Sequence, residues 1–446
     1  MNILVIGSGG REHAICHSFS KSKRLTRLFC ADGNAGIAEI AECVPIKPDD
    51  VAGLVEFAAS NEIDLTFVGG ETSLALGIVN IFTNRGLKIV GPSREAARLE
   101  ASKSFAKNFM ARHRVPTAGF VTAESTEIAK AALESGKFGD SETPVVVKAD
   151  GLAAGKGVVV AVDRAAAIEA IVEMKQLVGE AAADKIVLEE CLTGKEVSLL
   201  MFADGREFAL MPPTRDHKRI GEGDTGPNTG GMGTFTDRSL LSADELQTII
   251  DTIIHPTLDG CINDGFPFRG ILFLGLMMTK GGPKLLEYNV RFGDPETQAI
   301  LVRLKTDLVE ICQAMLGGTV GLSSANPVPT LSQLDIKWKA GSSACIVLAS
   351  EGYPAQPRVG DVISGVDKAG KVNNVEIFHA GTSHSTHETA PKGVITVANS
   401  SLVTSGGRVL GVTATGNDLK ESLETAYDAV DLISFEGMQY RGDIGK

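Results

Sequence analysis

Apolar and polar positions alternate along the first hundred residues in a way that predicts strands separated by helices. Four short apolar runs are typical of strands, at residues 2–6, 28–30, 65–68 and 88–90. Each run ends in a glycine-containing loop. Strands that alternate with helices predict a parallel, doubly wound sheet. Ligands of such sheets bind beyond the carboxyl ends of the strands, so the four loops mark a candidate binding edge.

The rest of the chain alternates longer helical patterns with strands and glycine-rich turns. Helices are expected at residues 94–113, 165–178, 243–264 and 419–433, and strands at 144–148, 158–162, 186–190, 270–278 and 285–291. Residues 221–233 form a glycine-rich loop, and the Ser, Asn and Pro content of residues 323–330 is typical of a linker. Residues 342–446 combine short strands, glycine turns and one helix, which predicts an α+β unit of its own.

The strand expected at residues 285–291 carries the most informative pattern in the chain. Glu287, Asn289 and Arg291 alternate with Tyr288 and Val290, and side chains two apart on a strand share a face. Carboxylate and amide oxygens are ligands that Mg²⁺ prefers, and a guanidinium beside them suits a phosphate. An ordinary edge strand with one mixed polar face would look the same, so this stretch alone does not decide between the two interpretations.

Composition and charge narrow the class of protein. The chain has 446 residues, 50 of them glycine, and only 5% aromatic residues, which is typical of an α/β enzyme with several subdomains and many loops. The net charge of −12 argues against nucleic acid or an anionic membrane as the main partner. No apolar run approaches a membrane span, and the N-terminus lacks the pattern of a secretory signal. A cytoplasmic enzyme is expected.

Cysteine and histidine spacing gives no sign of a metal centre. The seven cysteines form no C-x-x-C pair and their number is odd, which is typical of free thiols in a reducing compartment. His384 and His387 form an H-x-x-H, but they lie in a Ser- and Thr-rich segment without a nearby cysteine. An exposed loop is the favoured interpretation of that segment.

The first glycine loop is a candidate phosphate site. The spacing Gly7-x-Gly9-x-x-Glu12 resembles a dinucleotide fingerprint, but Glu12 stands where a third glycine would allow close packing of helix and strand. This substitution argues against NAD. Gly9 and Gly10 still leave backbone N–H groups at a helix N-terminus with Arg11 beside them, which suits a phosphate.

Residues 151–157 form a second glycine loop, with the spacing Gly-x-x-x-Gly-Lys-Gly. The spacing is one residue short of a P-loop, Gly157 replaces the hydroxyl that binds Mg²⁺, and strands are expected on both sides. A flap over nucleotide phosphates fits better, and an ordinary glycine hairpin is the alternative. Lys148 precedes the loop within an apolar strand, where a buried ammonium needs an anionic partner, and this favours the flap.

Several segments together closely resemble one family, and the likeness reaches from the N-terminus to the C-terminus. They are VIGSGGREH (5–13), GNAG (33–36), KADGLAAGKGV (148–158), DHKR (216–219), TGPNTGGMG (225–233), RFGDPET (291–297), FHAGT (378–382), GGRVL (406–410) and DIG (443–445). They resemble the phosphoribosylamine–glycine ligases, which are ATP-grasp enzymes. The resemblance implies a preATP-grasp doubly wound parallel sheet (1–101), a two-lobed ATP-grasp domain (102–325, with 123–186 as the mobile small lobe) and a C-terminal α+β cap (326–446).

The resemblance also implies an activity. ATP, glycine and 5-phosphoribosylamine would give glycinamide ribonucleotide, ADP and phosphate in de novo purine synthesis. Transfer of the γ-phosphoryl group to the carboxylate of glycine would make a glycyl phosphate, which the ribosylamine nitrogen then attacks. Such transfer depends on alignment and charge neutralisation more than on covalent chemistry by the protein. Transient contact with the enzyme that makes phosphoribosylamine is a further expectation.

Site residues follow from the same resemblance, position by position. The implied ligands of Mg²⁺ or Mn²⁺ are Glu287 and Asn289, and the implied catalytic residues are Arg291 and Asp216. The implied ATP-binding residues are Lys103, Lys148, Gly155, Gly157, Glu189, Glu190, Leu192 and Glu196. The implied substrate-binding residues are Gly9, Gly10, Arg11, Glu12, Asn34, Gly36, Glu71, Gly231 and Asp294. Family members commonly have proline where this chain has Gly70.

Simpler interpretations stand beside these. Lys103 could be an exposed helix lysine, Glu189 and Glu190 an ordinary strand end, and Asp216 a partner of Lys218 or Arg219. Two other functions are also open: a sister ATP-grasp ligase of purine synthesis that uses formate or bicarbonate, and a non-catalytic nucleotide-binding protein. The segments at residues 216–219 and 226–233 favour glycine over formate or bicarbonate, and the intact row of Glu287, Asn289 and Arg291 favours catalysis.

Overall fold

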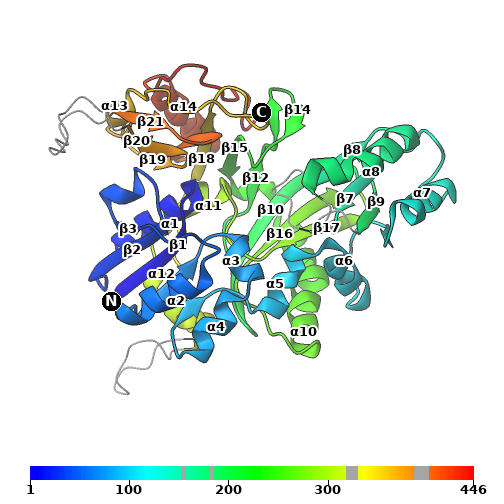
Figure 1. Ribbon diagram of the computed structural model, residues 1–446, viewed down its shortest axis with the longest axis horizontal. Coiled ribbons are helices and arrows are strands. Elements are labelled where there is room, and N and C mark those ends of the chain that lie inside the picture. The colour runs from blue at the N-terminus through cyan, green and yellow to red at the C-terminus, as the bar shows by residue number, and fades with distance from the viewer. Residues whose placement is uncertain (152–156, 180–184, 318–329, 386–400) are drawn as a thin grey trace.

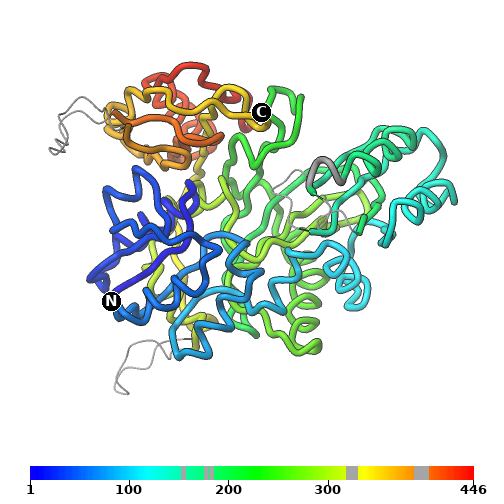
Figure 2. Tube along the Cα trace, viewed as in Figure 1, coloured from blue at the N-terminus to red at the C-terminus, as the bar shows by residue number. Residues whose placement is uncertain are grey.

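The structure is a computed structural model that describes residues 1–151, 157–179, 185–317, 330–385 and 401–446. N-terminal and C-terminal strands lie on one side of the molecule, and a smaller sheet with its helices extends on the other side (Figure 1). A long antiparallel sheet lies between them. The trace in Figure 2 leaves the N-terminal part, passes through the central region and returns to C-terminal strands near its start. Segments from the two ends of the sequence therefore come together.

The N-terminal sheet is parallel and doubly wound, as predicted. Its order is β3-β2-β1-β4-β5, and every pairing is parallel. The strands are β1 (Asn2–Gly7), β2 (Arg27–Asp32), β3 (Glu42–Val44), β4 (Leu65–Val68) and β5 (Ile89–Val90), and the helices are α1 (Gly10–Ser20), α2 (Val51–Ser60), α3 (Glu71–Ala75) and α4 (Ile78–Asn84). The order reverses between β1 and β4, so the loops after these strands meet where such sheets bind ligands.

The smaller sheet is antiparallel and has a core of its own. Its order is β6-β9-β7-β8, with β6 (Phe120–Ala123), β7 (Val145–Ala149), β8 (Val158–Ala161) and β9 (Ile186–Glu190). The helices α7 (Thr126–Glu134) and α8 (Arg164–Val178) pack against it through small and aliphatic side chains. The second glycine loop joins β7 to β8, so it lies between two strands and not before a helix, as expected.

The central sheet runs without a break into the C-terminal part. Its order is β17-β16-β10-β12-β15-β18-β22-β19, with β11 beside β10. The strands are β10 (Lys195–Asp204), β11 (Phe208–Leu210), β12 (Thr214–Asp216), β15 (Gly233–Thr236), β16 (Arg269–Thr279), β17 (Gly282–Asn289), β18 (Ser342–Ala349), β19 (Val375–His379) and β22 (Arg408–Gly416). The C-terminal unit stays a prediction, and its first strand continues the central sheet, because β18 pairs with β15 along four residue pairs.

Two predicted helices are interrupted. The helix expected at residues 94–113 divides into α5 (Arg94–Ala101) and α6 (Lys103–Arg112). Ser102 between them has an extended backbone, and its Oγ accepts from the Phe105 N–H as the N-cap of α6. The helix expected at residues 243–264 contains a π segment at Ile250–Ile254 between α9 (Ala243–Ile249) and α10 (His255–Asn263). This segment ends just before Pro256, which has no N–H to continue an α-helical ladder.

The remaining elements are short or lie at the edges. They are η1 (Ile37–Glu39), β13 (Arg219–Gly221), β14 (Thr225–Asn228), η3 (Arg238–Leu240), α11 (Glu296–Leu301), α12 (Leu308–Met315), η5 (Leu331–Gln333), α13 (Val366–Ala369), β20 (Thr382–His384), β21 (Leu402–Thr404) and α14 (Leu419–Val430). Within the described ranges, no helix has the length and apolar character that a membrane crossing would need.

Phe292 fixes the N-terminal sheet against the central sheet. It is fully buried, stacks on Phe67 of β4 at 5.8 Å between ring centroids and meets Phe202 of β10 edge-on at 6.2 Å. Both contacts belong to one hydrophobic core that also contains residues of α1 and α12. Because Phe292 follows Arg291, this packing holds the end of the informative strand against the loops of the N-terminal sheet.

Candidate active site

Strand β17 presents the two predicted metal ligands on one side. A bulge interrupts its pairing with β16, where Gly275 faces Glu287 and Leu276 faces Leu285. Beyond the bulge, Tyr288 and Val290 are buried and Glu287 and Asn289 are partly exposed, so the alternation expected there is present. The strand ends at Asn289, and Arg291 lies just after it. A bulge beside such a side chain re-aims it relative to the rest of the strand.

The Glu287 carboxylate lies among cations without pairing directly with any of them. Burial raises the pKa of Glu287, but Lys218, Lys148, Lys103 and Arg291 outweigh burial, so the net pKa is lowered. Across the described part of the chain, no side chain forms an ion pair or a hydrogen bond with this carboxylate. A carboxylate so placed, next to an amide oxygen, fits a hard divalent cation.

A divalent cation at Glu287 and Asn289 would need further ligands. No group of three or more His, Cys, Asp or Glu side chains is placed to hold a metal ion anywhere in the described residues. Mg²⁺ is usually held by one or two carboxylates together with phosphate oxygens and water. Glu287 and Asn289 therefore fit a metal that is shared with a phosphate ligand.

Two lysines flank a buried glutamate behind this strand. Glu189 of β9 forms ion pairs with Lys148 of β7 and Lys107 of α6, each at 2.8 Å. Lys107 also donates to Thr117 Oγ1 at 2.7 Å, and Thr117 donates to the Leu285 carbonyl at 2.6 Å. This chain of contacts joins the small sheet to β17. Sequence reasoning missed Lys107, although it lies four residues after Lys103 and so on the same face of α6.

The other predicted nucleotide residues are spread around this group. Lys103 is partly buried, its Nζ lies 3.4 Å from the Gly151 carbonyl, and desolvation lowers its pKa, so it is not the exposed helix lysine of the simpler interpretation. Glu190 points away from Glu189 and lies 3.6 Å from Lys284. Leu192 is partly buried in the segment after β9. The Gly157 carbonyl accepts from Ala149 N–H at 2.8 Å, and Gly155 lies outside the described residues.

Lys218 and Glu196 close one side of the group. Their side chains are half-exposed and 3.3 Å apart. Desolvation lowers the pKa of Lys218, but Glu196, Glu287 and further carboxylates raise it more, so the net pKa is raised. The sequence gives Lys218 no role beyond the alternative of pairing with Asp216. Its place facing Glu287 makes it a third lysine of the candidate phosphate site.

Arg291 is held by two carboxylates. Its Nη2 pairs with Glu100 at 2.7 Å and its Nε with Glu71 at 3.2 Å, while Asn289 Oδ1 accepts from Nη2 at 3.2 Å. Glu100 is buried and also accepts from the Val290 N–H at 2.8 Å. Sequence reasoning missed Glu100, which has no motif of its own. The guanidinium beside Asn289 is therefore oriented, but it is not free.

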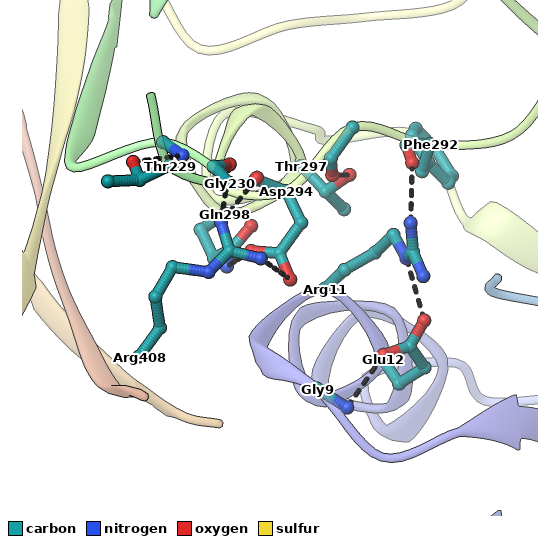
Figure 3. Close-up of polar contacts among 12 residues, drawn as sticks. Gly9, Arg11, Glu12, Thr229, Gly230, Phe292, Asp294, Thr297, Gln298 and Arg408 are labelled. Atoms are coloured by element: carbon teal, nitrogen blue, oxygen red, sulfur yellow. Dashed lines mark hydrogen bonds and ion pairs between the residues drawn. The ribbon is translucent and has the colours of Figure 1, made fainter. Parts of the chain in front are cut away.

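The loop after β1 is built around a buried Glu12. Its Oε2 accepts from the Gly9 N–H at 2.7 Å and its Oε1 from Arg11 Nε at 2.6 Å (Figure 3). A Cβ on Gly69 would clash with this carboxylate, so Glu12 packs where a dinucleotide fold needs empty space. Arg11 also donates to the Phe292 carbonyl at 3.1 Å. Glu12 thus orders the loop, which leaves Arg11 at its edge.

The second predicted substrate loop is braced by C-terminal residues. Asn34 Nδ2 donates to the Ser8 and His379 carbonyls, both at 2.8 Å, and Asn34 Oδ1 accepts from the Ile37 N–H. A Cβ on Gly36 would clash with the rings of His13 and His379. Gly36 is therefore required for the close approach of these rings, and Asn34 acts as a brace whose polar atoms are all engaged.

Asp216 at the end of β12 and Glu296 at the start of α11 form a pair of carboxylates. Burial raises the pKa of each, and the charge of Glu296 raises that of Asp216 further. Asp216 Oδ1 is buried without a hydrogen-bond partner among the described residues. Neither Lys218 nor Arg219 forms an ion pair with it, so the simpler interpretation of Asp216 is wrong. A Cβ on Gly231 would lie 2.8 Å from Asp216 Oδ1, which places this loop over the carboxylate.

Asp294 lies beside the first glycine loop at the edge of the N-terminal sheet. Burial raises its pKa, but Arg408 and Arg11 outweigh burial and lower it. Its Oδ1 accepts from Gln298 Nε2 at 2.8 Å, and a Cβ on Gly10 would lie 2.7 Å from the same nitrogen. Gly10 and Asp294 are thus brought together through Gln298. The sequence motifs supply both residues but not their contact.

Comparisons with known proteins agree over the whole length. Models of three domains of phosphoribosylglycinamide synthetase match this chain: the N domain at residues 1–100, the ATP-grasp (A) domain at 101–297 and the C domain at 343–446. A phosphoribosylamine–glycine ligase of Caldanaerobacter subterraneus is 42% identical over 445 residues, covering 100% of this chain and 99% of its own. One of Vibrio vulnificus is 43% identical over 451 residues, covering 100% and 98%.

Solved structures give the same answer. The crystal structure of phosphoribosylamine–glycine ligase from Thermotoga maritima covers 100% of both chains with 32% identity and a TM-score of 0.79. The biotin carboxylase domain of Hydrogenobacter thermophilus 2-oxoglutarate carboxylase covers 98% of this chain and 91% of its own with a TM-score of 0.68, but at 14% identity it shows the fold alone. The predicted α/β ATP-grasp architecture is confirmed, and the chain belongs to the phosphoribosylglycinamide synthetase family.

Proposed function

We propose that this chain ligates glycine to 5-phosphoribosylamine at the expense of ATP, giving glycinamide ribonucleotide, ADP and phosphate. The full-length relatives named phosphoribosylamine–glycine ligase support this activity. The observation that carries it in this chain is the Glu287 carboxylate, which faces four cations without pairing with any of them. This arrangement suits a polyphosphate and a metal between strand β17 and the lysines. The full-length relatives are named for glycine, and these names are what favour glycine over formate or bicarbonate.

ATP would bind between the small sheet and β17. Lys103, Lys148 and Lys218 would neutralise its phosphates, and Glu196 at the outer side would meet the ribose. Glu287 and Asn289 would hold Mg²⁺ or Mn²⁺, which supplies charge neutralisation and alignment for phosphoryl transfer. The Hydrogenobacter neighbour, whose fold is alike, is named as a complex with MgADP. Glu189 would act behind this site by holding Lys148 in place.

Glycine would lie near the Asp216 and Glu296 carboxylates. Lys218 acts on both carboxylates without forming an ion pair with either of them, and an ammonium group would supply a direct cationic partner for this pair. Arg291 lies on the phosphate side, where it would stabilise the acyl phosphate. Asp216 and Glu296 would hold the ammonium group of glycine. Its carboxylate would then face the γ-phosphoryl group beside Glu287 and Asn289 of β17.

Phosphoribosylamine would occupy the edge of the N-terminal sheet. Gly10 and Arg11 would receive its phosphate at the start of α1, beside Gly9, whose own N–H is held by Glu12. Asn34, Gly36, Glu71 and Asp294 border the same edge. The amine would attack the carbonyl carbon of glycyl phosphate: a C–N bond forms, the acyl C–O bond breaks, phosphate leaves with the electron pair, and the nitrogen releases one proton to water.

An ADP-release assay tests the proposed function. Purified protein receives ATP, Mg²⁺ and phosphoribosylamine with glycine, formate or bicarbonate in separate reactions. We expect ADP and glycinamide ribonucleotide only with glycine. Turnover with formate or bicarbonate in the absence of glycine would favour the sister ligases, and ATP binding without any ADP release would favour the non-catalytic alternative. Hydroxylamine added in place of phosphoribosylamine should trap glycyl phosphate as glycyl hydroxamate.

Two further expectations concern the cell. A cytoplasmic location and direct transfer of phosphoribosylamine from the enzyme that makes it remain predictions from the sequence. Direct transfer can be tested with a chemical trap for free phosphoribosylamine in a coupled reaction of both enzymes. Loss of coupled product in the presence of the trap would count against direct transfer.

A further inference from the structure

Arg408, at the start of β22, joins two loops that belong to different substrate sites. Its Nη1 donates to the Gly230 carbonyl at 2.7 Å and to the Asp294 carbonyl at 2.6 Å, and its Nη2 pairs with Asp294 Oδ2 at 3.0 Å. Figure 3 shows the guanidinium between Gly230 and Asp294, on the opposite side of Asp294 from Arg11. The family motif contains this arginine, but the proposed chemistry gives it no task.

The Gly230 side of this contact is closely packed. A Cβ on Gly230 would lie 3.0 Å from Arg408 Cζ, and the Gly230 N–H donates to the Tyr353 hydroxyl at 3.0 Å. Tyr353 also packs on Gly407, where a Cβ would clash with its ring. Residues of the C-terminal part therefore hold Gly230 through both its N–H and its carbonyl. The next residue, Gly231, lies against Asp216 of the proposed glycine site.

The Asp294 side leads to the other substrate. The second carboxylate oxygen of Asp294 binds Gln298, which packs on Gly10 of the proposed phosphate site. Burial lowers the pKa of Arg408, but Asp294 and further groups outweigh burial and raise it, so the guanidinium stays charged. Its two terminal nitrogens have three acceptors within 3.0 Å. A planar fork of this kind fixes the relative position of the groups that it bridges.

We propose that Arg408 is a positioning residue that sets the distance between the glycine site and the phosphoribosylamine site. This inference rests on the proposed function. Arg408 would not contact ATP or the metal; it would align the amine with the acyl carbon after glycyl phosphate has formed. Its loss should therefore impair C–N bond formation more than phosphoryl transfer.

The test separates these two steps in the variant Arg408→Met. Glycinamide ribonucleotide formation is measured with phosphoribosylamine, and glycyl hydroxamate formation is measured with hydroxylamine, a small nucleophile that needs no positioning by this loop. We expect product formation to fall ~10²-fold, the scale of a misplacement of about 1 Å. We expect hydroxamate formation and the KM for ATP to stay within ~3-fold of wild type, because Arg408 would not contact ATP or the metal.

Further variants keep the test independent of folding. Arg408→Lys retains the charge but not the fork, and we expect intermediate product formation. Added guanidinium should restore part of the product formation of Arg408→Gly. Arg358→Met removes another arginine of the C-terminal part, one that pairs with Glu351 and Asp361 and contacts neither Gly230 nor Asp294, and it should behave as wild type. Thermal melting of every variant checks that each is folded.

Three results would overturn the proposal. One is wild-type product formation by Arg408→Met. The second is an equal fall of product and hydroxamate, which would mean that Arg408 acts on phosphoryl transfer or on the fold as a whole. The third is a large rise of the KM for ATP alone. Absence of glycine-dependent ADP release in the wild type would instead contradict the proposed function, so the two failures are distinguishable.

Discussion

The charges around Glu287 and those around Arg291 lie within one short stretch of chain, yet they are arranged differently. Glu287 faces lysines that it does not touch, whereas Arg291 is tied to Glu71 and Glu100 by ion pairs of 3.2 and 2.7 Å. Unmatched charges in a partly buried place are costly unless a ligand completes them. Matched charges need no ligand and hold their neighbours in place. The comparison separates side chains whose charge a bound ligand would complete from side chains that hold their neighbours in position.

Replacement of Glu287 by Gln tests the unmatched side and should have the largest effect. The amide is similar in size but lacks the charge that a divalent cation needs. We expect kcat to fall ~10³-fold, in line with the loss of a preorganised electrostatic contact, and the Mg²⁺ concentration for half-maximal rate to rise. ATP binding without metal should persist, because a negative charge near the phosphates has been removed. Both can be measured by ADP release and by nucleotide titration.

The control for this change is Glu207→Gln, which alters an exposed glutamate between β10 and β11. It should keep the kcat and the Mg²⁺ dependence of the wild type. If Glu287→Gln also kept the Mg²⁺ dependence of the wild type, the metal would have to lie elsewhere. Glu287 would then not be a charge that a ligand completes, in contrast to the paired charges around Arg291.

Replacement of Arg291 by Ala tests the matched side. We expect turnover to fall ~10²-fold while ATP binding stays largely intact, because the nucleotide lysines are untouched. Glu100 would be left buried with the Val290 N–H but without its ion-pair partner, so the free energy of unfolding should fall by about 3 kcal/mol. Turnover is measured by ADP release, binding by nucleotide titration and stability by denaturation. Unchanged turnover would exclude a role for Arg291 in stabilising the acyl phosphate.

A second substitution separates the two roles of Arg291. Burial raises the pKa of Glu100, although Arg291 opposes this rise, so Glu100 without Arg291 is easily neutralised. The double variant Arg291→Ala with Glu100→Gln should regain stability but not turnover. Recovery of both would mean that Arg291 only supports the fold.

The sequence predicts these sites where the signal is local. Alternation along β17 has a period of two, so the shared side of Glu287 and Asn289 could be read directly, as could the order of strands and helices in the N-terminal sheet. The break at Ser102 could not, because Asp150, far along the chain, accepts from the Ser104 N–H at 2.6 Å and stabilises the new helix start. Contacts between distant segments leave no periodic trace.

The same reason explains the missed residues. Glu100 and Lys107 matter only through partners brought together by the fold, and Arg408 reaches Asp294 only because β18 extends the central sheet from β15. The motifs supplied most of the chemical groups, whereas their pairing depends on tertiary structure. Lys107 is the residue for which a simple pattern could have helped, since it follows Lys103 by one helical turn.

Replacement of Lys107 by Met gives the smallest effect and the sharpest pH signature. Glu189 keeps Lys148 as a partner, so the loss should be about 1 kcal/mol and the KM for ATP should rise ~5-fold. Burial, together with the charge of Lys148, lowers the pKa of Lys107 from 10.5 to about 8. Between these two values the unfolded chain holds a proton that the folded chain has released. The free energy of unfolding of the wild type relative to Lys107→Met should therefore rise with pH across this window.

Denaturation of both proteins between pH 7 and pH 10.5 measures this difference directly. Below about pH 8 both states of the wild type carry the proton, so the difference should be flat there. Lys280→Met, which removes an exposed lysine from the turn between β16 and β17, should show no rise in the window. A difference that fell with rising pH would mean that Glu189 favours the charge of Lys107 more than burial opposes it. Lys107 would then be a fully paired charge like those around Arg291, and it would no longer belong to the charges of the Glu287 region.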